Sequence, residues 1–585
     1  PIEFATVRIA GTAVGATTGL DGSYSLSVAE SDTIEIIFTC IGYKEHKQKL
    51  ISPSGNVNVN AKLFKTTREL EAIEVTEYKK QTGGMQTLDA GQLKVGPNAS
   101  GNAVEGLLTT IAGVSSKDEM SSQYSVRGGS YDENSVYING IEVYRPQLIS
   151  SGQQEGLSII NPSLVGSIEF STGGFSAEYG DKMSSVLDIT YRQPESFEGN
   201  VAASLMGAAI GQSTGKFSQL HGIRYKRNTT LLSSLETKGE YDPSFFDYQT
   251  NLRLKLNDQW NISFLGNIAM NNYKFTPKTR STSFGTSQNV KEFTVYFDGK
   301  ERDRFETYFG ALELNYDVNK STGFTLLASG FLTNELVAYD ISGEYWLDEA
   351  GTNDGENSVG GEIGVGKYLE HSRNRFQAGV FTLGLKGHTS LNRHNLQYGL
   401  EYRNQQIYDR TSEWEQRDSA GYSLPNIDNK LEMIYNLTSK HDLTTNKLSW
   451  YAQDTYRLLV NAGMFTFNGG LRMSYWDFNN EFLVSPRISI GYIPEFYNSL
   501  SFRLSGGLYY QSPFYKEFRE TKTDENGNSY AELNRDIKSQ RSIQLILGGD
   551  YTFRALDRPF KITAEAYYKK LDDIIPYELD NLKIV

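Results

Sequence analysis

Residues 173–189, GGFSAEYGDKMSSVLDI, gather the residue types that could do chemistry in one short segment. Glu178, Asp181 and Lys182 supply two acids and a base, and the glycines and serines around them would suit a catalytic loop or a phosphate cradle. The same composition suits a structural joint, because glycines permit tight turns. The segment holds no His or Cys and ends in an apolar run at 186–189. Its role therefore depends on the elements that position it.

The rest of the chain offers little catalytic chemistry. The six histidines show no HExxH spacing, and no nucleophile elbow or P-loop is present. With one cysteine, Cys40, the chain can form no internal disulfide and no Cys-based metal site. The acidic stretch 348–358, DEAGTNDGENS, could hold Ca²⁺, but it lacks EF-hand spacing and reads as a solvated loop. We therefore expect no enzyme activity and no cofactor.

Charge and composition favour a β-rich protein that does not bind nucleic acid. Asp and Glu number 70 against 57 Lys and Arg, and the net charge of -13 disfavours phosphate backbones. The sequence has no run of about 18 apolar residues, the length that a membrane helix requires. Gly (55), Tyr (37) and Phe (30) are abundant and Pro (14) is scarce, which suits strands with one apolar face.

From about residue 197 onward the sequence alternates with period 2. Leu396, Tyr398, Leu400 and Tyr402 fall on one face, for example, and polar residues fall on the other. Short turns alternate with long polar loops, expected at 276–303, 336–373, 406–445 and 512–538. Short turns at one end and long loops at the other are typical of a transmembrane β-barrel. A propeller is disfavoured because no repeat of roughly 40–50 residues is visible.

Two smaller regions precede this pattern. Residues 81–195 combine a helix, indicated by Val104, Leu107, Leu108 and Ile111 and ended by Gly113, with several strands. Residues 1–65 predict short strands at 5–12, 22–28 and 33–43, with a hairpin turn at 21–22. Cys40 falls in the third of these strands, where it is expected to be a small buried apolar residue.

These regions carry a family resemblance. The segments LLTTIAGVSS, QYSVRGGSYDENSVYINGIEVYRPQ and INPSLVGSIEFSTGGFSAEYGDKMSSVLDI resemble the plug domain of TonB-dependent outer-membrane receptors. PIEFATVRIAGTAVGATTGLDGSYSL and IIFTCIGYKEH resemble the carboxypeptidase-regulatory-like domain that precedes the plug in the Bacteroidetes type. The resemblance covers essentially the whole chain. Ser176, Asp181, Lys182 and the Asn139-Gly140 pair depart mildly from the family pattern.

The resemblance implies a mainly β fold in three parts. A small β-sandwich (1–66, its first strand absent) and a linker (67–80) would lead to an α/β plug (81–195). The plug would occlude a transmembrane antiparallel β-barrel (196–585) in the outer membrane of a Gram-negative bacterium. Barrels of this family have about 22 strands, of which roughly 15 are visible here, so the chain is expected to continue for about seven more.

The resemblance also implies energised import of a scarce extracellular ligand. TonB would add as a strand to a periplasmic segment and pull the plug. The alternating segment 70–76 is the candidate contact, with residues Leu70, Glu71, Ala72, Ile73, Glu74, Val75 and Thr76. A first plug strand or a plain linker is the other interpretation of this segment.

Further candidate residues lie in the plug. Arg127 and Glu178 are expected to lock plug to barrel through ion pairs. Ligand contacts at the plug apex are expected from Tyr131, Asp132, Asn134, Tyr144, Arg145 and Gln147.

The partners implied are TonB, outer-membrane lipids and a surface lipoprotein or other outer-membrane subunit. A non-transporting subunit that scaffolds a membrane complex, or a signalling receptor, is the alternative function. The resemblance leaves the class of ligand open among iron chelates, cobalamin, glycans and peptides.

Overall fold

The computed structural model has five sheets in the residues that it describes, one of which is the two-stranded sheet of β6 (Val114–Ser116) and β7 (Tyr124–Val126). It describes all residues except 1, 3–4, 11, 13, 20, 29–32, 41–45, 52–56, 64–83, 95–101, 117–121, 145–157, 203–206, 228–238, 287–288, 350–362, 419–430, 498, 526, 557, 577–578, 581–582 and 585. No helix in the described part combines the length and the apolar character needed to cross a membrane.

The N-terminal domain is a four-stranded antiparallel sheet in the order β2-β1-β3-β4. Its strands are β1 (Thr6–Ile9), β2 (Gly15–Thr17), β3 (Thr33–Thr39) and β4 (His46–Ile51). The strand predicted at 22–28 is not present as such. Tyr24 and Leu26 still pack against the buried Val7 and Phe38, but Tyr24 fixes the segment with a 2.9 Å hydrogen bond from its hydroxyl to the carbonyl of Val59. Cys40 directly follows β3 and is half-buried.

The inner domain (residues 84–194) is a small α/β unit around the mixed sheet β5-β10-β11-β8-β9. Its elements are β5 (Gln86–Leu88), η1 (Ala90–Lys94), α1 (Ala103–Leu108), β6 (Val114–Ser116), β7 (Tyr124–Val126), η2 (Tyr131–Glu133), β8 (Asn134–Ile138), β9 (Ile141–Glu142), η3 (Pro162–Leu164), β10 (Val165–Ser171) and β11 (Ser185–Tyr191). Strands β8 and β11 are parallel, and the other pairs are antiparallel.

Local sequence signals in the inner domain predicted its helix, whereas the turn at residues 139–140 was not predicted. Val104 and Leu108 of α1 are buried, and Gly113 adopts φ 83° soon after the helix ends. Asn139 and Gly140, both with positive φ (55° and 76°), form the two-residue turn between β8 and β9. Asn and Gly are the residues that such a turn favours, because both tolerate the left-handed region.

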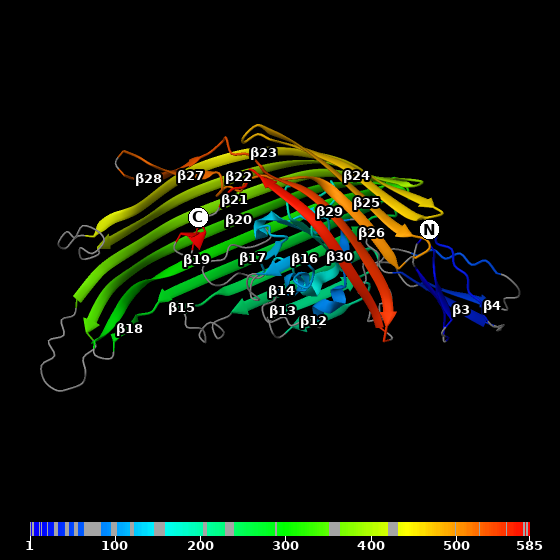
Figure 1. Ribbon diagram of the computed structural model, residues 1–585, viewed down its shortest axis with the longest axis horizontal. Coiled ribbons are helices and arrows are strands. Elements are labelled where there is room, and N and C mark those ends of the chain that lie inside the picture. The colour runs from blue at the N-terminus through cyan, green and yellow to red at the C-terminus, as the bar shows by residue number, and fades with distance from the viewer. Residues whose placement is uncertain are drawn as a thin grey trace.

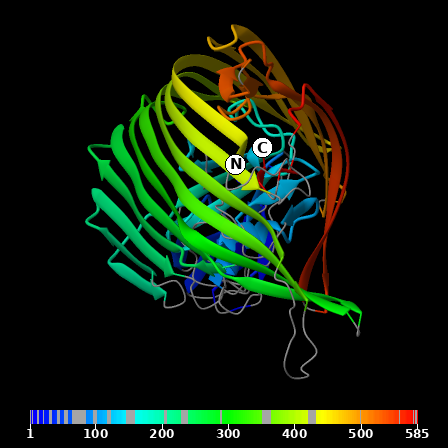
Figure 2. The same cartoon turned by 90° about the vertical axis from the view of Figure 1, so that its left-hand side faces the viewer.

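The barrel wall is a 19-stranded sheet that follows chain order and curves around the inner domain (Figures 1 and 2). Its strands are β12 (Glu198–Ala202), β13 (Gly207–Ser213), β14 (Phe217–Arg227), β15 (Gly239–Tyr241), β16 (Ser244–Lys255), β17 (Trp260–Pro277), β18 (Arg280–Thr286), β19 (Asn289–Asp317), β20 (Thr322–Glu349), β21 (Ile363–Leu391), β22 (His394–Asp418), β23 (Glu432–Val460), β24 (Gly463–Trp476), β25 (Glu481–Pro494), β26 (Leu500–Gln511), β27 (Arg519–Thr523), β28 (Ser529–Leu533), β29 (Gln540–Ala555) and β30 (Arg558–Asp572). A short hairpin, β31 (Leu579–Asp580) and β32 (Lys583–Ile584), follows.

Fifteen wall strands form one continuous antiparallel meander, as the sequence predicted. Strands β15, β18, β27 and β28 are side additions, because β14 pairs with β16, β17 with β19, and β26 with β29. The short turns lie at the end near the N-terminal domain, on the right of Figure 1.

The predicted long loops at the other end are a partial error. Most of 289–303, 336–349, 363–373, 406–418 and 432–445 are strand, because the alternation persists in polar sequence and the ladders simply continue.

The wall is apolar on its outer face and polar on its inner face, the reverse of a water-soluble protein. Leu312, Leu385, Leu400 and Ile488 are 47% to 58% exposed on the outer face, whereas polar and charged side chains such as Arg487 are buried on the inner face. This is the arrangement of a barrel whose outside meets lipid.

Aromatic residues form a girdle near the short turns of the wall. Their rings stack between neighbouring strands, with centroids 4.3 Å apart for Trp260 and Tyr316 and 4.4 Å apart for Phe465 and Tyr492. Tyr551, Phe553 and Phe560 continue the row on β29 and β30. Aromatic girdles of this kind lie at membrane–water interfaces.

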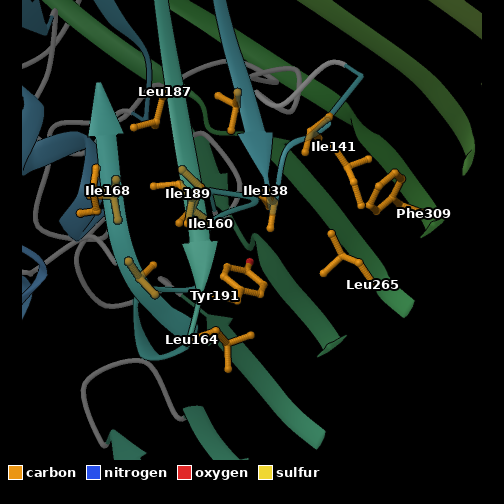
Figure 3. Packing of buried hydrophobic residues seen from close by; sticks show 14 of the residues in the cluster. Ile138, Ile141, Ile160, Leu164, Ile168, Leu187, Ile189, Tyr191, Leu265 and Phe309 are labelled. Carbon is orange, nitrogen blue, oxygen red and sulfur yellow. The ribbon is translucent and has the colours of Figure 1, made fainter. Parts of the chain in front are cut away.

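The largest core joins the inner domain to the wall (Figure 3). Ile138 and Ile141 of the β8–β9 hairpin belong to the same buried cluster as Leu265 of β17 and Phe309 of β19. Apolar burial therefore holds one side of the inner domain against β17–β21.

Candidate functional site

The other side of the inner domain is held by polar contacts, and they converge on residues 172–184. We call this segment the anchor loop; it connects β10 to β11. The Arg487 guanidinium, from β25, donates to the carbonyls of Ser176 and Tyr179, each at 2.6 Å. The same guanidinium lies over the rings of Phe175 (5.0 Å) and Tyr509 (4.4 Å).

Two neighbouring wall strands add bonds to the anchor-loop backbone. Arg472 of β24 donates to the carbonyl of Glu178 at 3.2 Å, and Gln453 of β23 accepts the Ala177 N–H at 2.9 Å. Gly180 leaves room for this arginine, since a Cβ there would lie 2.4 Å from the Arg472 guanidinium. The glycine of this turn thus serves close approach of a wall side chain.

Asp181 is the charged centre of the anchor loop. Its backbone has φ 56°, and its carboxylate accepts a 2.6 Å hydrogen bond from Lys447 and lies 3.7 Å from Arg403. Burial alone would raise the pKa of Asp181, but Lys447, Arg403 and Arg472 together hold it well below its usual range. Asp181 therefore stays ionised and bound to two wall strands.

Lys182 contacts both the inner domain and the wall. Its ammonium donates to the carbonyl of Asp132 and lies 4.4 Å from the centre of the Phe514 ring. Burial lowers the pKa of Lys182, and the nearby carboxylates of Asp132 and Glu142 oppose that shift.

Arg127 also bonds the inner domain to the wall, through β30. Its guanidinium forms an ion pair with Glu565 and lies 4.7 Å from the centre of the Tyr567 ring. Glu565 binds Arg503 of β26 as well. A second ion pair joins the same surfaces, between Lys569 and Glu133 at 3.0 Å.

Glu178 contacts the wall in a different way from the expected ion pair. Its carboxylate accepts a 3.2 Å bond from the Ser176 hydroxyl, whereas its backbone carbonyl is the group that binds Arg472. Burial raises the pKa of Glu178, and Lys386 of the wall opposes this.

A second polar contact holds residues 158–160 against β14 and β16. Arg224 donates to the carbonyls of Ser158 (2.7 Å) and Ile160 (2.9 Å) and to the Asp247 carboxylate (2.8 Å). Gln249 donates to the carbonyl of Ile159 at 2.6 Å. Both sides of the inner domain thus carry wall contacts through backbone carbonyls.

The predicted apex residues are divided between structural and wall contacts. Asn134 is buried, donates to the carbonyl of Tyr124 at 2.6 Å and accepts from Ser185 at 2.8 Å, so its side chain is internal. Asp132 accepts a 3.2 Å bond from Gln511, and Tyr144 accepts a 2.7 Å bond from Gln405.

Among the remaining predicted residues and segments, the structure describes Tyr131. Tyr131 is half-buried, and its carbonyl accepts a 3.1 Å bond from Asn134. Arg145, Gln147 and the segment 70–76 lie outside the described residues, as does 350–358 of the acidic stretch.

A small cavity of about 70 Å³ lies where the anchor loop meets the wall. Asp181, Lys182, Arg403, Lys447 and Glu142 bring charge to it, and Trp476 and Phe514 bring rings. This volume has room for a few water molecules. Within the described residues, no three His, Cys, Asp or Glu side chains are placed to hold a metal ion.

Sequence reasoning missed the wall half of this interface. Arg403, Lys447, Arg472 and Arg487 all face inward, one on each of the four successive strands β22–β25, opposite the apolar outer face. These residues could have been found from charged side chains at alternate positions of a strand. In the segment LEYRNQQ, for example, Glu401 and Arg403 both fall on the polar face.

Family profiles match three successive parts of the chain. Residues 1–75 match the CarboxypepD_reg-like domain and residues 78–185 the TonB-dependent Receptor Plug Domain. Residues 223–581, more than half of the chain, match the TonB dependent receptor-like beta-barrel. No curated protein matches the sequence.

Two solved structures share the fold at low sequence identity. The ferric yersiniabactin uptake receptor FyuA of Yersinia pestis aligns with a TM-score of 0.53 at 14% identity, over 84% of this chain and 73% of its own. The RagAB peptide importer aligns with a TM-score of 0.53 at 10% identity, over 85% of this chain and 68% of its own. At such identities the likeness describes fold.

Proposed function

Because this chain belongs to the TonB-dependent receptor family, we propose that it binds a scarce extracellular ligand and imports it into the periplasm with energy from TonB. The family consists of outer-membrane receptors and transporters of Gram-negative bacteria, and the lipid-facing wall fits that location. The inner domain corresponds to the family's plug.

The observation that carries the proposal is the nature of the interface between inner domain and wall. Wall side chains from β22 to β30 bind the anchor loop and Arg127 through ion pairs and through hydrogen bonds to backbone carbonyls. Such bonds can be exchanged for bonds to water, whereas an apolar interface would have to expose its whole buried surface at once. The polar part of the interface, along β22–β30, therefore suits a domain that must move and return, while the apolar part along β17–β21 holds the other side.

The N-terminal end of the inner domain supplies a place for force to act. Its first strand, β5, is only three residues long and lies at the sheet edge, where it pairs with β10 alone. The candidate TonB contact at 70–76 precedes it in the chain. TonB pairing with 70–76 would pull on this short edge strand before any other element of the inner domain.

A surface lipoprotein is a further proposed partner. The family resemblance implies such a partner, and the wall of this chain shares its fold with the RagAB peptide importer. Co-purification from native membranes under mild detergent, followed by identification of the bound subunits, tests this partner.

Deletion of residues 70–76 tests the import proposal. The purified TonB C-terminal domain should bind the intact receptor and lose most of its affinity for the deletion variant. Cells that carry the deletion should fail to accumulate the labelled compound recovered from the wild-type receptor. As a matched control, seven residues of the exposed β18 hairpin can be replaced by a Gly-Ser linker of equal length, with TonB binding retained.

The two functions give different results in this experiment. A scaffolding subunit would keep its partners and its cell-surface role after the deletion. Uptake that continues at the wild-type rate without residues 70–76 would contradict TonB-driven import through that segment.

A further inference from the structure

Four aromatic rings form a ladder on the wall far from the inner domain. Phe293 and Tyr345 stack with centroids 5.8 Å apart and planes inclined by 16°, and Tyr345 and Tyr368 stack at 5.6 Å and 30°. Phe297 meets Tyr368 edge-on at 6.3 Å, and the Arg280 guanidinium lies 5.8 Å from the centre of the Phe297 ring. The ladder crosses strands β19, β20 and β21.

The ladder faces the lumen. Phe293 and Phe297 have the same parity on β19 as Phe309, which packs against the inner domain, and pairing places Tyr345 and Tyr368 on the same face. Gly343 lies beneath the Tyr368 ring, where a Cβ would be 2.2 Å from the ring atoms. The tyrosine ring therefore lies flat along the wall.

A second aromatic cluster on the inner face of the wall is covered by another segment of the protein. Phe376 and Trp476 of the wall, with Phe478, are covered by Tyr515 and Phe518 of the docked segment (residues 512–539), which folds inward between β26 and β29. The Phe478 and Phe518 centroids are 4.4 Å apart. The Tyr515 hydroxyl donates to Asp409 at 2.8 Å, so the docked ring combines an apolar face with a hydroxyl bonded to a carboxylate.

The four-ring ladder has no such cover within the part of the chain that the structure describes. Its rings stack on one another and on Arg280, and no ring of another described segment lies on them. Phe293, Tyr345 and Tyr368 are all half-buried, so part of each ring remains open to the lumen.

Acidic side chains outnumber basic ones on the lumen face that carries the ladder. Strand pairing places six carboxylates on the lumen face of β19–β22 above the inner domain, in addition to Asp409, which pairs with Arg519. These are Glu301, Asp303, Glu335, Glu370, Glu413 and Glu415. The basic residues on this face are Arg280, Lys291 and Arg417. An excess of negative charge repels anions and favours neutral or cationic ligands.

We propose that this ladder is a ligand-binding platform for a neutral, hydroxyl-bearing ring, namely the pyranose rings of an uncharged oligosaccharide. The flat faces of sugar rings stack on aromatic side chains, and their hydroxyls donate to carboxylates, as the Tyr515 hydroxyl does to Asp409. An anionic chelate would be repelled by the excess of carboxylates on this face. The proposal rests on the receptor function proposed above and names the substrate class of that receptor.

A glycan array tests the platform directly on the full chain in detergent. The probes are immobilised neutral oligosaccharides, their sialylated counterparts, a ferric catecholate chelate and Trp-containing peptides. The receptor should bind at least one neutral oligosaccharide and discriminate against its sialylated form. The variants Tyr345→Ala and Tyr368→Ala each remove one ring, and each should weaken binding by up to about tenfold.

Matched variants separate stacking from folding. Tyr345→Phe keeps the ring and should bind within about threefold of wild type, because only the hydroxyl is lost. Tyr296→Ala removes a ring from the opposite face of β19, which is 49% exposed, and should leave binding unchanged. Glu370→Gln should reduce the discrimination against sialylated probes.

Several outcomes would overturn the proposal. They are binding of only the ferric chelate or only the peptides, no binding of any neutral oligosaccharide by folded receptor, and oligosaccharide binding unaffected by loss of both tyrosines. The import proposal and the platform proposal can be contradicted separately. If the receptor binds glycans and deletion of 70–76 leaves uptake intact, the platform is supported and TonB-driven import is contradicted. If the receptor instead takes up an anionic chelate in a TonB-dependent way, import is supported and the platform is contradicted.

Discussion

Lys447 of β23 donates a 2.6 Å hydrogen bond to the carboxylate of Asp181, so one side chain of the wall is bonded to a left-handed turn of the inner domain. Arg487 and Arg472 bind carbonyls in the same loop. The conformation of the anchor loop is thus matched to fixed positions on three successive wall strands.

Loss of Arg127 should loosen the inner domain. Arg127→Ala leaves Glu565 with Arg503 alone and removes a partly buried charge pair, which should cost about 1–3 kcal/mol of docking free energy. Hydrogen exchange should then speed up in β7 and in the anchor loop. Arg227→Ala, which breaks the exposed pair with Asp242, is the control and should leave exchange unchanged. Equal exchange in both variants would contradict a locking role.

Docking of the inner domain should weaken as the pH rises through the range set by Asp188. Burial raises the pKa of this residue to about 7; the Tyr179 hydroxyl donates to it at 2.9 Å and opposes the shift, while Glu178 and Glu169 add to it and Lys386 opposes it. Since the folded pKa lies above the ordinary value of 3.8, stability is greatest at low pH and falls between about pH 4 and pH 7.

Asp188→Asn tests this dependence. The amide still accepts from Tyr179 but does not ionise, so hydrogen-exchange protection should vary much less over pH 4.5–8. A residual slope is expected from Glu178, whose pKa burial also raises. If protection depends on pH as steeply in the variant as in the wild type, groups other than Asp188 cause the dependence.

Gly463 should tolerate no side chain. It begins β24 with φ 142°, and a Cβ there would lie 2.1 Å from the carbonyl oxygen of Ile493. Gly463→Ala should cost at least about 1–3 kcal/mol of wall stability, measured as the denaturation midpoint of refolded protein in detergent. Gly330→Ala is the matched control, since nothing lies within 4 Å of the added methyl group. Similar midpoints for the two variants would refute the steric argument.

The docked segment should detach when its aromatic anchor is removed. Phe518→Ala empties a buried site against Trp476 and Phe478, at a cost of about 3–5 kcal/mol. Exchange in residues 512–539 should rise while the ladders of β21–β24 stay protected. Tyr515→Phe loses only the bond to Asp409 and should cost about 1 kcal/mol. If Phe518→Ala leaves the segment protected, other contacts hold it.

Local signals made the inner domain largely predictable. The periodic Val104 and Leu108 and the following Gly113 act within a few residues of themselves, and the structure places a helix and a helix end there. The pair Asn139-Gly140 was a further local signal, and it went unused although the structure has a turn there. The alternation of the wall was equally visible, because period 2 follows directly from strand geometry. Strand ends were less predictable, since polar residues above the bilayer keep the same alternation.

The partners across the interface were not predictable in this way. Asp181 and Lys447 are 266 residues apart, and nothing local to either residue specifies the other. Glu178 looked like an anchor because of its charge, yet the structure uses its carbonyl. Backbone acceptors carry no sequence signal, since every residue has one.

The long strands of the wall set the height of the receptor's mouth. Strands β19, β21 and β23 each have 29 residues, whereas about 9–11 suffice to cross a bilayer. Because the turns at the N-terminal-domain end are short, the surplus stands on the outer side and raises the rim by roughly 40 Å. A solute would therefore meet this rim well before it met the lipid head groups.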